Sequence, residues 1–304
     1  MTIAFLALAP IFALIILGAL LRRTAFVPDS FWPAAEKSIY YLFFPCLLFS
    51  ELATADIDLG ALLPMGLSMM GAVLVMAILL LGLHQVWRLP GPPFSSIFQG
   101  GIRPNSYVGL AAAFGMFGQQ GVALVAIGIA FVVPTVNVLA VAILVRHGAS
   151  GKVSGMDVVR GIITNPLILA VVAGVLWNLT ELPLPPVIDT MLEILGRASL
   201  PLGLLAVGAG LDLGAVTQAR YRVAASAAVK LLAVPALTAG LCLALGVGGM
   251  AAAVAVLYNG LPTSASSYVL ARQMGGDATM MAGIITLTTL AAIVTIPIVL
   301  TLAP

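Results

Sequence analysis

Long apolar stretches recur along the whole chain, separated by short segments that hold charged residues, glycine or proline. A helix needs about 20 mostly apolar residues to cross the hydrocarbon core of a bilayer. The pattern therefore predicts an all-α membrane protein with ten transmembrane helices. The predicted spans are residues 3–21, 36–53, 60–83, 95–117, 121–145, 161–179, 188–210, 222–245, 250–272 and 278–301.

Two of the boundaries between these spans carry no charge. Residues 104–145 and 231–271 contain no charged side chain, yet each stretch is too long for one span. The sequences GQQG (118–121) and GVGG (246–249) hold typical turn residues. We therefore expect the chain to turn at these two places.

Composition excludes a soluble protein. Only 8% of the residues are charged and 62% are hydrophobic, whereas a soluble domain carries about 25% charged residues. The formal net charge of +2 is too small and too dispersed to indicate binding of nucleic acid. Lipid is therefore the expected surrounding of most of the chain.

The placement of Lys and Arg predicts the orientation in the membrane, because inner loops collect these residues. With the N-terminus outside, Arg197 is the one basic residue on the outer side. The inner side then collects Arg22, Arg23, Lys37, Arg88, Arg146, Lys152, Arg160, Arg220, Arg222 and Arg272. An even number of spans places both termini outside.

Proline and glycine also recur at a nearly constant distance in the two halves of the chain. The pairs are Pro10 with Pro166, Gly18 with Gly174, Pro45 with Pro201 and Asp56 with Asp212, each 156 residues apart, and Pro104 with Pro262, 158 residues apart. Because each half holds five spans, an odd number, the second half must enter the membrane from the opposite side. This predicts a first repeat (1–145), a cytoplasmic linker (146–160) and a second, inverted repeat (161–304), an architecture of secondary transporters.

The fourth and ninth predicted spans hold proline beside polar residues in mid-span. They read GGIRPNSYVGL (100–110) and YNGLPTSASSYVL (258–270). Proline removes a backbone donor and disturbs the preceding turn, and irregular backbone survives at membrane depth only when buried or beside a cavity. Ordinary proline kinks would not need the polar neighbours, so the pattern favours two broken helices at a binding site.

The charged residues within the spans indicate the class of ligand. Arg103 and Lys230 are the charged side chains that lie well inside predicted spans, and no Asp or Glu lies at that depth to pair with them. An unpaired Arg beside the N-terminus of a half-helix favours an anion. Alternatively, the Arg103 side chain extends to the membrane interface or bonds to freed carbonyls. Lys230 lies about two turns inside its span, so we expect its side chain to extend to the interface.

The candidate site therefore gathers around the two prolines, and it requires neither a metal nor a cofactor. Asn137, in the fifth span, either lines the same cavity or makes a helix-to-helix hydrogen bond. The expected substrate-binding residues are Arg103, Pro104, Asn105, Ser106, Asn137, Asn259, Pro262, Thr263 and Ser264. His84 and His147 lie at span ends, without an HExxH motif or paired intramembrane aspartates, so the sequence does not indicate an enzyme.

At these residues the chain resembles the auxin efflux carrier family, whose bacterial members include malonate and malate permeases. The motifs are RPNSYVGL (103–110) and LPTSASSYVLARQMGGD (261–277), and the likeness extends over essentially the whole chain. The resemblance implies the fold of bile-acid and sodium/proton carriers, with crossing fourth and ninth helices, elevator-type movement and a homodimer. It also implies a multi-pass protein of a prokaryotic plasma membrane.

These observations together predict a secondary transporter that moves a small organic anion, such as malate, malonate or an auxin-like acid. Backbone carbonyls and hydroxyl groups around Asn105 and Asn259 could bind sodium, so a sodium-coupled symporter of the same fold is an alternative. A membrane receptor or assembly factor that binds a ligand without moving it is the alternative from another class.

Overall fold

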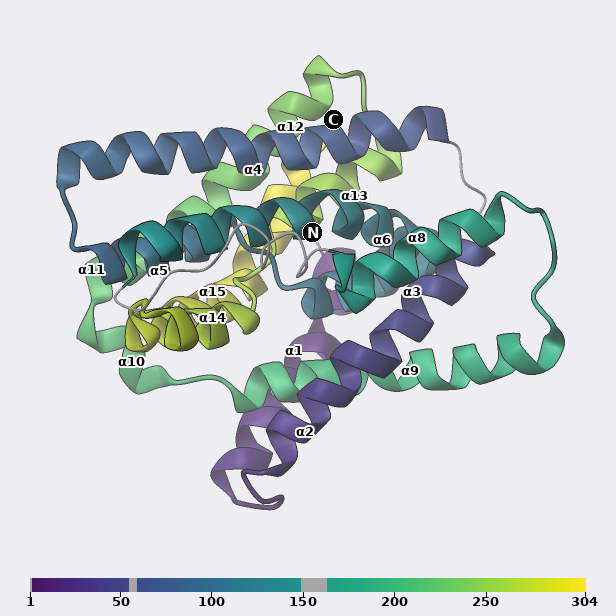
Figure 1. Ribbon diagram of the computed structural model, residues 1–304, viewed down its shortest axis with the longest axis horizontal. Coiled ribbons are helices and arrows are strands. Elements are labelled where there is room, and N and C mark those ends of the chain that lie inside the picture. Colours follow the sequence, from purple (N-terminus) through teal and green to yellow (C-terminus); the bar gives the residue numbers. More distant parts are fainter. Residues whose placement is uncertain (1, 55–58, 149–162) are drawn as a thin grey trace.

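The computed structural model describes residues 2–54, 59–148 and 163–304, and within these ranges every regular element is a helix (Figure 1). The bounds are α1 Thr2–Arg23, α2 Phe31–Ser38, η1 Ile39–Phe43, α3 Phe44–Ala53, α4 Leu59–Trp87, α5 Gly91–Ile102, α6 Ser106–His147, α8 Pro166–Asn178, α9 Pro186–Ala209, α10 Leu213–Gln218, α11 Arg220–Ala228, η2 Val229–Ala233, α12 Val234–Ala244, α13 Gly249–Asn259, α14 Ser266–Met274, α15 Ala278–Val299 and η3 Leu300–Leu302. The expectation of an all-α protein is confirmed for these residues.

Several helices are long and apolar enough to cross a membrane. Within the described ranges they number five: Leu62–Trp87, Ser106–His147, Pro186–Ala209, Arg220–Ala244 and Ala278–Leu302. Two shorter apolar helices, α8 and α13, accompany them. Large apolar side chains on the outside, such as Ile78 at 68% and Val187 at 82% exposure, fit a surface that faces lipid.

The two uncharged boundaries are turns, as predicted. Helix α6 is bent at Gly118, whose φ of 64° lies in the left-handed region. The chain between α12 and α13 turns through Gly246 (φ 70°) and Gly249 (φ 61°). Glycine adopts this region at little cost, which explains why the turns fall at these residues.

Two predicted spans are interrupted. Residues 103–105 separate α5 from α6, and residues 260–265 separate α13 from α14. We call these segments the first break and the second break. Both lie at the prolines that the sequence singled out, and the linker predicted at 146–160 lies mostly outside the described residues.

The helices form two groups. Helices α1, α3, α8 and α9 pack mainly on one another, and they occupy the lower and right part of Figure 1. Helices α4, α5 and α10–α15 occupy the upper and left part. Helix α6 packs on α4, α5 and α13 of the second group and also touches α1, α3, α8 and α9.

Glycine allows the helices of the first group to approach closely. A Cβ atom on Gly18 of α1 would lie 2.0 Å from the carbonyl oxygen of Leu205 in α9. A Cβ atom on Gly174 of α8 would lie 2.9 Å from the carbonyl oxygen of Phe49 in α3. Small residues at such contacts are what packing of membrane helices requires.

Two π-turns, η1 and η2, each end two residues before a proline, Pro45 and Pro235. Proline has no N–H and its ring clashes with the carbonyl of the preceding turn. A wider turn accommodates both effects. The second of these turns carries Lys230, which contributes to the site described below.

The glycine contact predicts a loss of stability in Gly18→Ala. The new methyl group would displace the backbone of α9, so we expect the free energy of unfolding to fall by about 1–3 kcal/mol. The matched control is Gly82→Ala, where no atom lies within 4 Å of the added Cβ; its melting temperature in detergent should be unchanged or slightly raised. Equal melting temperatures of the two variants would contradict the close contact.

Candidate functional site

The two breaks lie against each other and are joined by backbone hydrogen bonds. The N–H of Asn105 donates to the carbonyl of Pro262 at 2.8 Å, and the N–H of Ser264 donates to the carbonyl of Arg103 at 3.1 Å. The two bonds form an antiparallel bridge. Each break thus supplies partners for backbone groups that the other break has freed.

Side chains satisfy further backbone groups at the breaks. The Oδ1 atom of Asn105 accepts from the N–H groups of Tyr107 (3.1 Å) and Val108 (3.4 Å), which caps the N-terminus of α6. The hydroxyl of Thr263 donates to the carbonyl of Gly100 at 2.8 Å. The N–H of Thr263 donates to the hydroxyl of Thr288 in α15 at 3.1 Å. Irregular backbone is stable here because these freed groups find partners within the protein.

Arg103 is buried in the first break and does not extend to an interface. Its side chain is 9% exposed, and Nη2 donates to Oδ1 of Asn137 at 2.7 Å. This bond ties the break to the second part of α6, so Asn137 makes a hydrogen bond between two segments, the second of its two expected roles. Neither ion pair found in the described part of the chain involves Arg103.

Two nitrogen atoms at the first break have no partner. Nη1 of Arg103 and Nδ2 of Asn105 are buried, and neither donates to any atom of the described residues. Both atoms are hydrogen-bond donors, and one belongs to a cation. A buried group of this kind requires an acceptor, so the first break is arranged for an anionic or carbonyl oxygen.

Lys230 does not lie where the sequence analysis expected it. Its side chain is fully buried, and Nζ donates to the carbonyl oxygen of Asn259 at 2.6 Å, so the prediction that it extends to the membrane interface is wrong. The physical reason is the second break: α13 ends at Asn259, and the carbonyl there has no helical N–H to accept. Lys230 supplies the missing donor.

The side chain of Asn259 faces other helices. Its Nδ2 atom donates to the carbonyl of Met69 in α4 at 3.0 Å and to the hydroxyl of Thr238 in α12 at 2.8 Å. Its Oδ1 atom is buried and accepts no hydrogen bond from the described residues. The second break therefore leaves an acceptor without a partner, whereas the first break leaves donors.

The remaining predicted residues pair through hydroxyl groups. Ser106 and Tyr258 lie 2.9 Å apart, oxygen to oxygen, and link the start of α6 to α13. Ser264 pairs with Ser266 at 2.9 Å at the start of α14. Seven of the nine predicted residues are thus joined by bonds between the two spans or to Asn137, and Pro104 lies in the bridge between them. Asn259 instead bonds to α4, α12 and η2.

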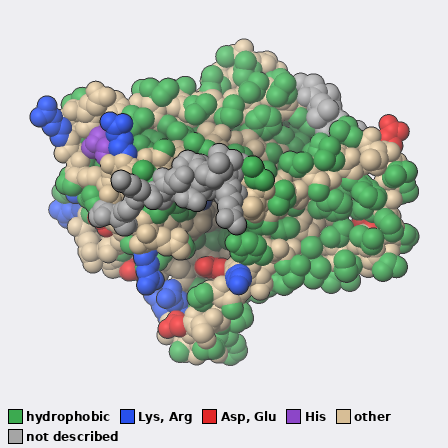
Figure 2. All heavy atoms as spheres, in the orientation of Figure 1, with side chains coloured by type: hydrophobic (Ala, Val, Ile, Leu, Met, Phe, Trp, Pro, Cys, Tyr) green, Lys and Arg blue, Asp and Glu red, His purple; other side chains and the backbone are tan. Residues whose placement is uncertain are grey.

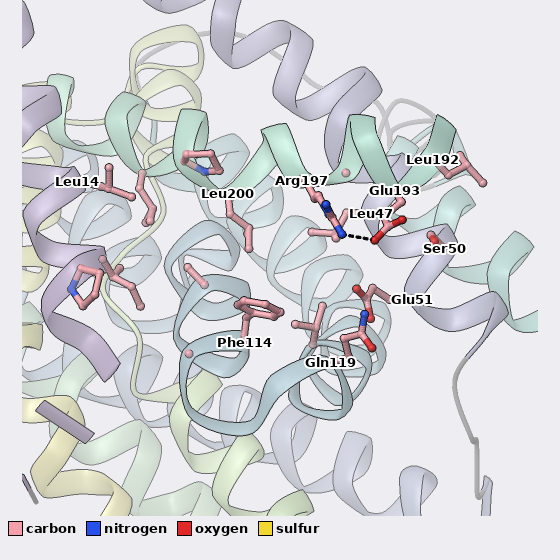
Figure 3. Close-up of a pocket in the computed structure, with 18 of the residues that line it drawn as sticks. Leu14, Leu47, Ser50, Glu51, Phe114, Gln119, Leu192, Glu193, Arg197 and Leu200 are labelled. Carbon is pink, nitrogen blue, oxygen red and sulfur yellow. Dashed lines mark hydrogen bonds and ion pairs between the residues drawn. The ribbon is translucent and has the colours of Figure 1, made fainter. Parts of the chain in front are cut away.

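A cavity of about 730 Å³ lies near the first break, and sequence reasoning missed the residues that line it. It is bounded by α1, α3 and α9 on one side and by both parts of α6 on the other (Figure 3). Polar side chains in its wall are Ser50, Glu51, Thr54, Gln119, Asp189, Glu193 and Arg197. None of the nine predicted residues is among its lining residues.

The cavity and the first break share helix α6. Ala111 lines the cavity and lies six residues after Asn105, which corresponds to about 9 Å along a helix. Glu193 and Arg197 form the ion pair that their spacing of four predicts, and Figure 3 shows them opposite Glu51 and Gln119. The signal that could have found the cavity is the set of charged residues at span ends.

The geometry described so far defines a multi-pass membrane protein with a buried polar site between two interrupted helices, an arrangement typical of transporters. A family model described as "Membrane transport protein" matches residues 3–300. The chain belongs to this family, which confirms its resemblance to the auxin efflux carrier family.

A relative supports the same class. A protein named "Uncharacterized transporter" from Methanothermobacter thermautotrophicus is 23% identical over 292 residues, which cover 95% of this chain and 94% of that protein. The chain is therefore a membrane transporter, a class that is distinct from enzymes.

The bond from the second break to the end of α5 can be tested through Thr263→Val. The substitution keeps the shape of the side chain but leaves the carbonyl of Gly100 without its partner. An unsatisfied buried group costs about 1–3 kcal/mol, so the melting temperature in detergent should fall clearly. Thr301→Val is the control, because the hydroxyl of Thr301 is exposed and bonds only its own helix turn. Similar melting temperatures for the two variants would show that the bond contributes nothing.

Proposed function

We propose that the protein is a secondary transporter that moves a small organic anion across a prokaryotic plasma membrane by elevator-type alternating access. The observation that carries the proposal is the Arg103 guanidinium, which is buried in the first break with one nitrogen atom unpartnered among the described residues. A charge buried in a membrane protein is costly and usually faces a ligand or partner.

The ligand class follows from the donors at the first break. Nη1 of Arg103 and Nδ2 of Asn105 both need acceptors, and the N-terminus of α6 adds a partial positive charge at the same place. A carboxylate offers several lone pairs to such donors. We therefore assign a carboxylate, such as malate, malonate or an auxin-like acid, to this site.

The packing of glycine supports two inverted repeats of five spans each, 1–145 and 161–304, joined by the linker. Gly174 lies 156 residues after Gly18, and Leu205 lies 156 residues after Phe49. The close contact between Gly18 and Leu205 thus has its counterpart in the contact between Gly174 and Phe49. A pseudo-twofold axis that relates the two halves would produce such a pair of equivalent contacts. The two broken helices would then cross near this axis.

The two helix groups supply the parts that elevator movement requires. Helices α1, α3, α8 and α9 would form the scaffold and the homodimer contact, and the second group would carry the site. The cavity lies between the first group and α6, because α1, α3 and α9 line it together with α6, and α6 packs on α4, α5 and α13 of the second group. Movement between the groups would open and close such a space.

Charge distribution supports an orientation with one end of the molecule in the cytoplasm. On the face seen in Figure 2, Lys and Arg side chains gather at the left and lower parts, and the right-hand end shows only acidic charge. The left end carries the turn between α4 and α5, and the right end carries the turn between α8 and α9. We assign the basic end to the cytoplasm.

Transport by proteoliposomes tests the proposal. We expect saturable uptake of at least one of radiolabelled malate, malonate and an indole acid, and a loss of about tenfold or more in Arg103→Gln, because a hydrogen bond to a charged group contributes about 1.5–3 kcal/mol. Arg222→Gln, at an exposed position of α11, is the control that removes a positive charge away from the breaks.

The possible outcomes separate the alternatives. Uptake that survives Arg103→Gln with intact folding would move the anion site elsewhere. Binding of an acid without flux would favour a receptor, and uptake that requires a sodium gradient would favour a symporter. If none of the three acids binds or moves, the assignment of an anion fails, while membership of the transporter family stands.

A further inference from the structure

Lys230 is a buried cation that the anion site does not use. Its side chain is 0% exposed, it lies on the π-turn η2, and its Nζ atom is 2.6 Å from the carbonyl oxygen of Asn259. This distance is at the short end for a hydrogen bond from a charged nitrogen. No ion pair of the described residues includes Lys230, so its partner is backbone oxygen.

The surroundings of Lys230 are those of a site for a small cation. The C-terminus of α13 carries a partial negative charge, and its last carbonyl, that of Asn259, points at Nζ. The Oδ1 atom of the same residue is buried without a partner in the described part of the chain. The Nδ2 atom of Asn259 is held by the hydroxyl of Thr238 and the carbonyl of Met69, which fixes the orientation of this amide.

The chemistry of these oxygen atoms favours a monovalent ion. Carbonyl and amide oxygens are neutral ligands, and unwound backbone with a half-helix C-terminus suits sodium in transporters. Ca²⁺ and Mg²⁺ sites instead rely on carboxylates. The first break leaves donors without partners and the second break leaves an acceptor, so the two breaks differ in the sign of the charge they favour.

We propose that the Lys230 ammonium occupies a monovalent-cation position at the second break. The wild-type protein then binds no sodium there, because the position is already filled by a cation that is part of the chain. Removal of the amine opens the position to Na⁺. The consequence for coupling, transport without a sodium requirement, rests on the proposed function, whereas the consequence for ion binding does not.

Two variants at the same position make the test. Lys230→Thr shortens the side chain and leaves space beside the oxygen atoms, with a hydroxyl as a further ligand. Lys230→Met keeps most of the length and fills the space without charge. Melting temperatures of the purified proteins are compared in NaCl, KCl and choline chloride at equal ionic strength, since a ligand that binds the folded state raises the melting temperature in a concentration-dependent way.

The expected result is a saturable rise of several degrees with NaCl over choline chloride for Lys230→Thr, and no difference for the wild type and Lys230→Met. A wild-type protein stabilised by Na⁺ to the same degree as Lys230→Thr would overturn the proposal, since the position would not be filled. A Lys230→Thr protein that folds but does not respond to Na⁺ would overturn it as well.

A folding failure is also informative. If Lys230→Thr is recovered as a monodisperse protein only when it is extracted in NaCl, the ion replaces the amine and the proposal is supported. Failure of both Lys230→Thr and Lys230→Ser in every salt, with Lys230→Met folded, would overturn it. None of these measurements uses an organic acid, so they stand even if the anion assignment fails.

Discussion

Every backbone N–H and C=O group at membrane depth needs a partner within the protein, and this constraint determines the centre of the molecule. Two interrupted spans free several such groups. They are stable because they face each other: Asn105 bonds to Pro262, Ser264 bonds to Arg103, and the Thr263 hydroxyl reaches Gly100. Neither break could persist alone, so the site depends on the meeting of two segments about 160 residues apart in the chain.

The same constraint explains why two cations are buried there. Lys230 supplies a donor that the end of α13 lacks, and its burial is offset by the carbonyl of Asn259 and by the helix C-terminus. The burial of Arg103 is offset only in part. Asn137 accepts a hydrogen bond from one nitrogen atom of its guanidinium, and another nitrogen atom has no partner among the described residues. Among the described residues, the first break thus leaves two buried donors without a partner, whereas Asn259 beside the second break leaves a buried acceptor.

The sequence predicted the helices, both uncharged turns and the positions of both breaks, because these follow from local signals: apolar length, glycine and proline. For Asn137 it left two roles open and did not predict Arg103 as the hydrogen-bond partner. It did not predict the burial of Lys230, since that depends on where α13 ends and on the wide turn before Pro235. The cavity was missed for a similar reason. Its walls come from helices distant in the chain and from the bend at Gly118, and no periodicity encodes their spacing.

The bonds at the breaks also bear on movement. Arg103 bonds to Asn137 in α6. Thr263 bonds to Thr288 in α15, and Lys230 bonds to Asn259 in α13. None of these bonds involves a helix of the first group. Contact with the first group near the site is instead made by the stacked rings of Phe44 and Tyr107, whose centroids are 4.5 Å apart. Stacked rings can slide without leaving a polar group unpaired, whereas breaking a buried hydrogen bond leaves two. A displacement between the groups would therefore cost least if it carried the two breaks and Lys230 as one body.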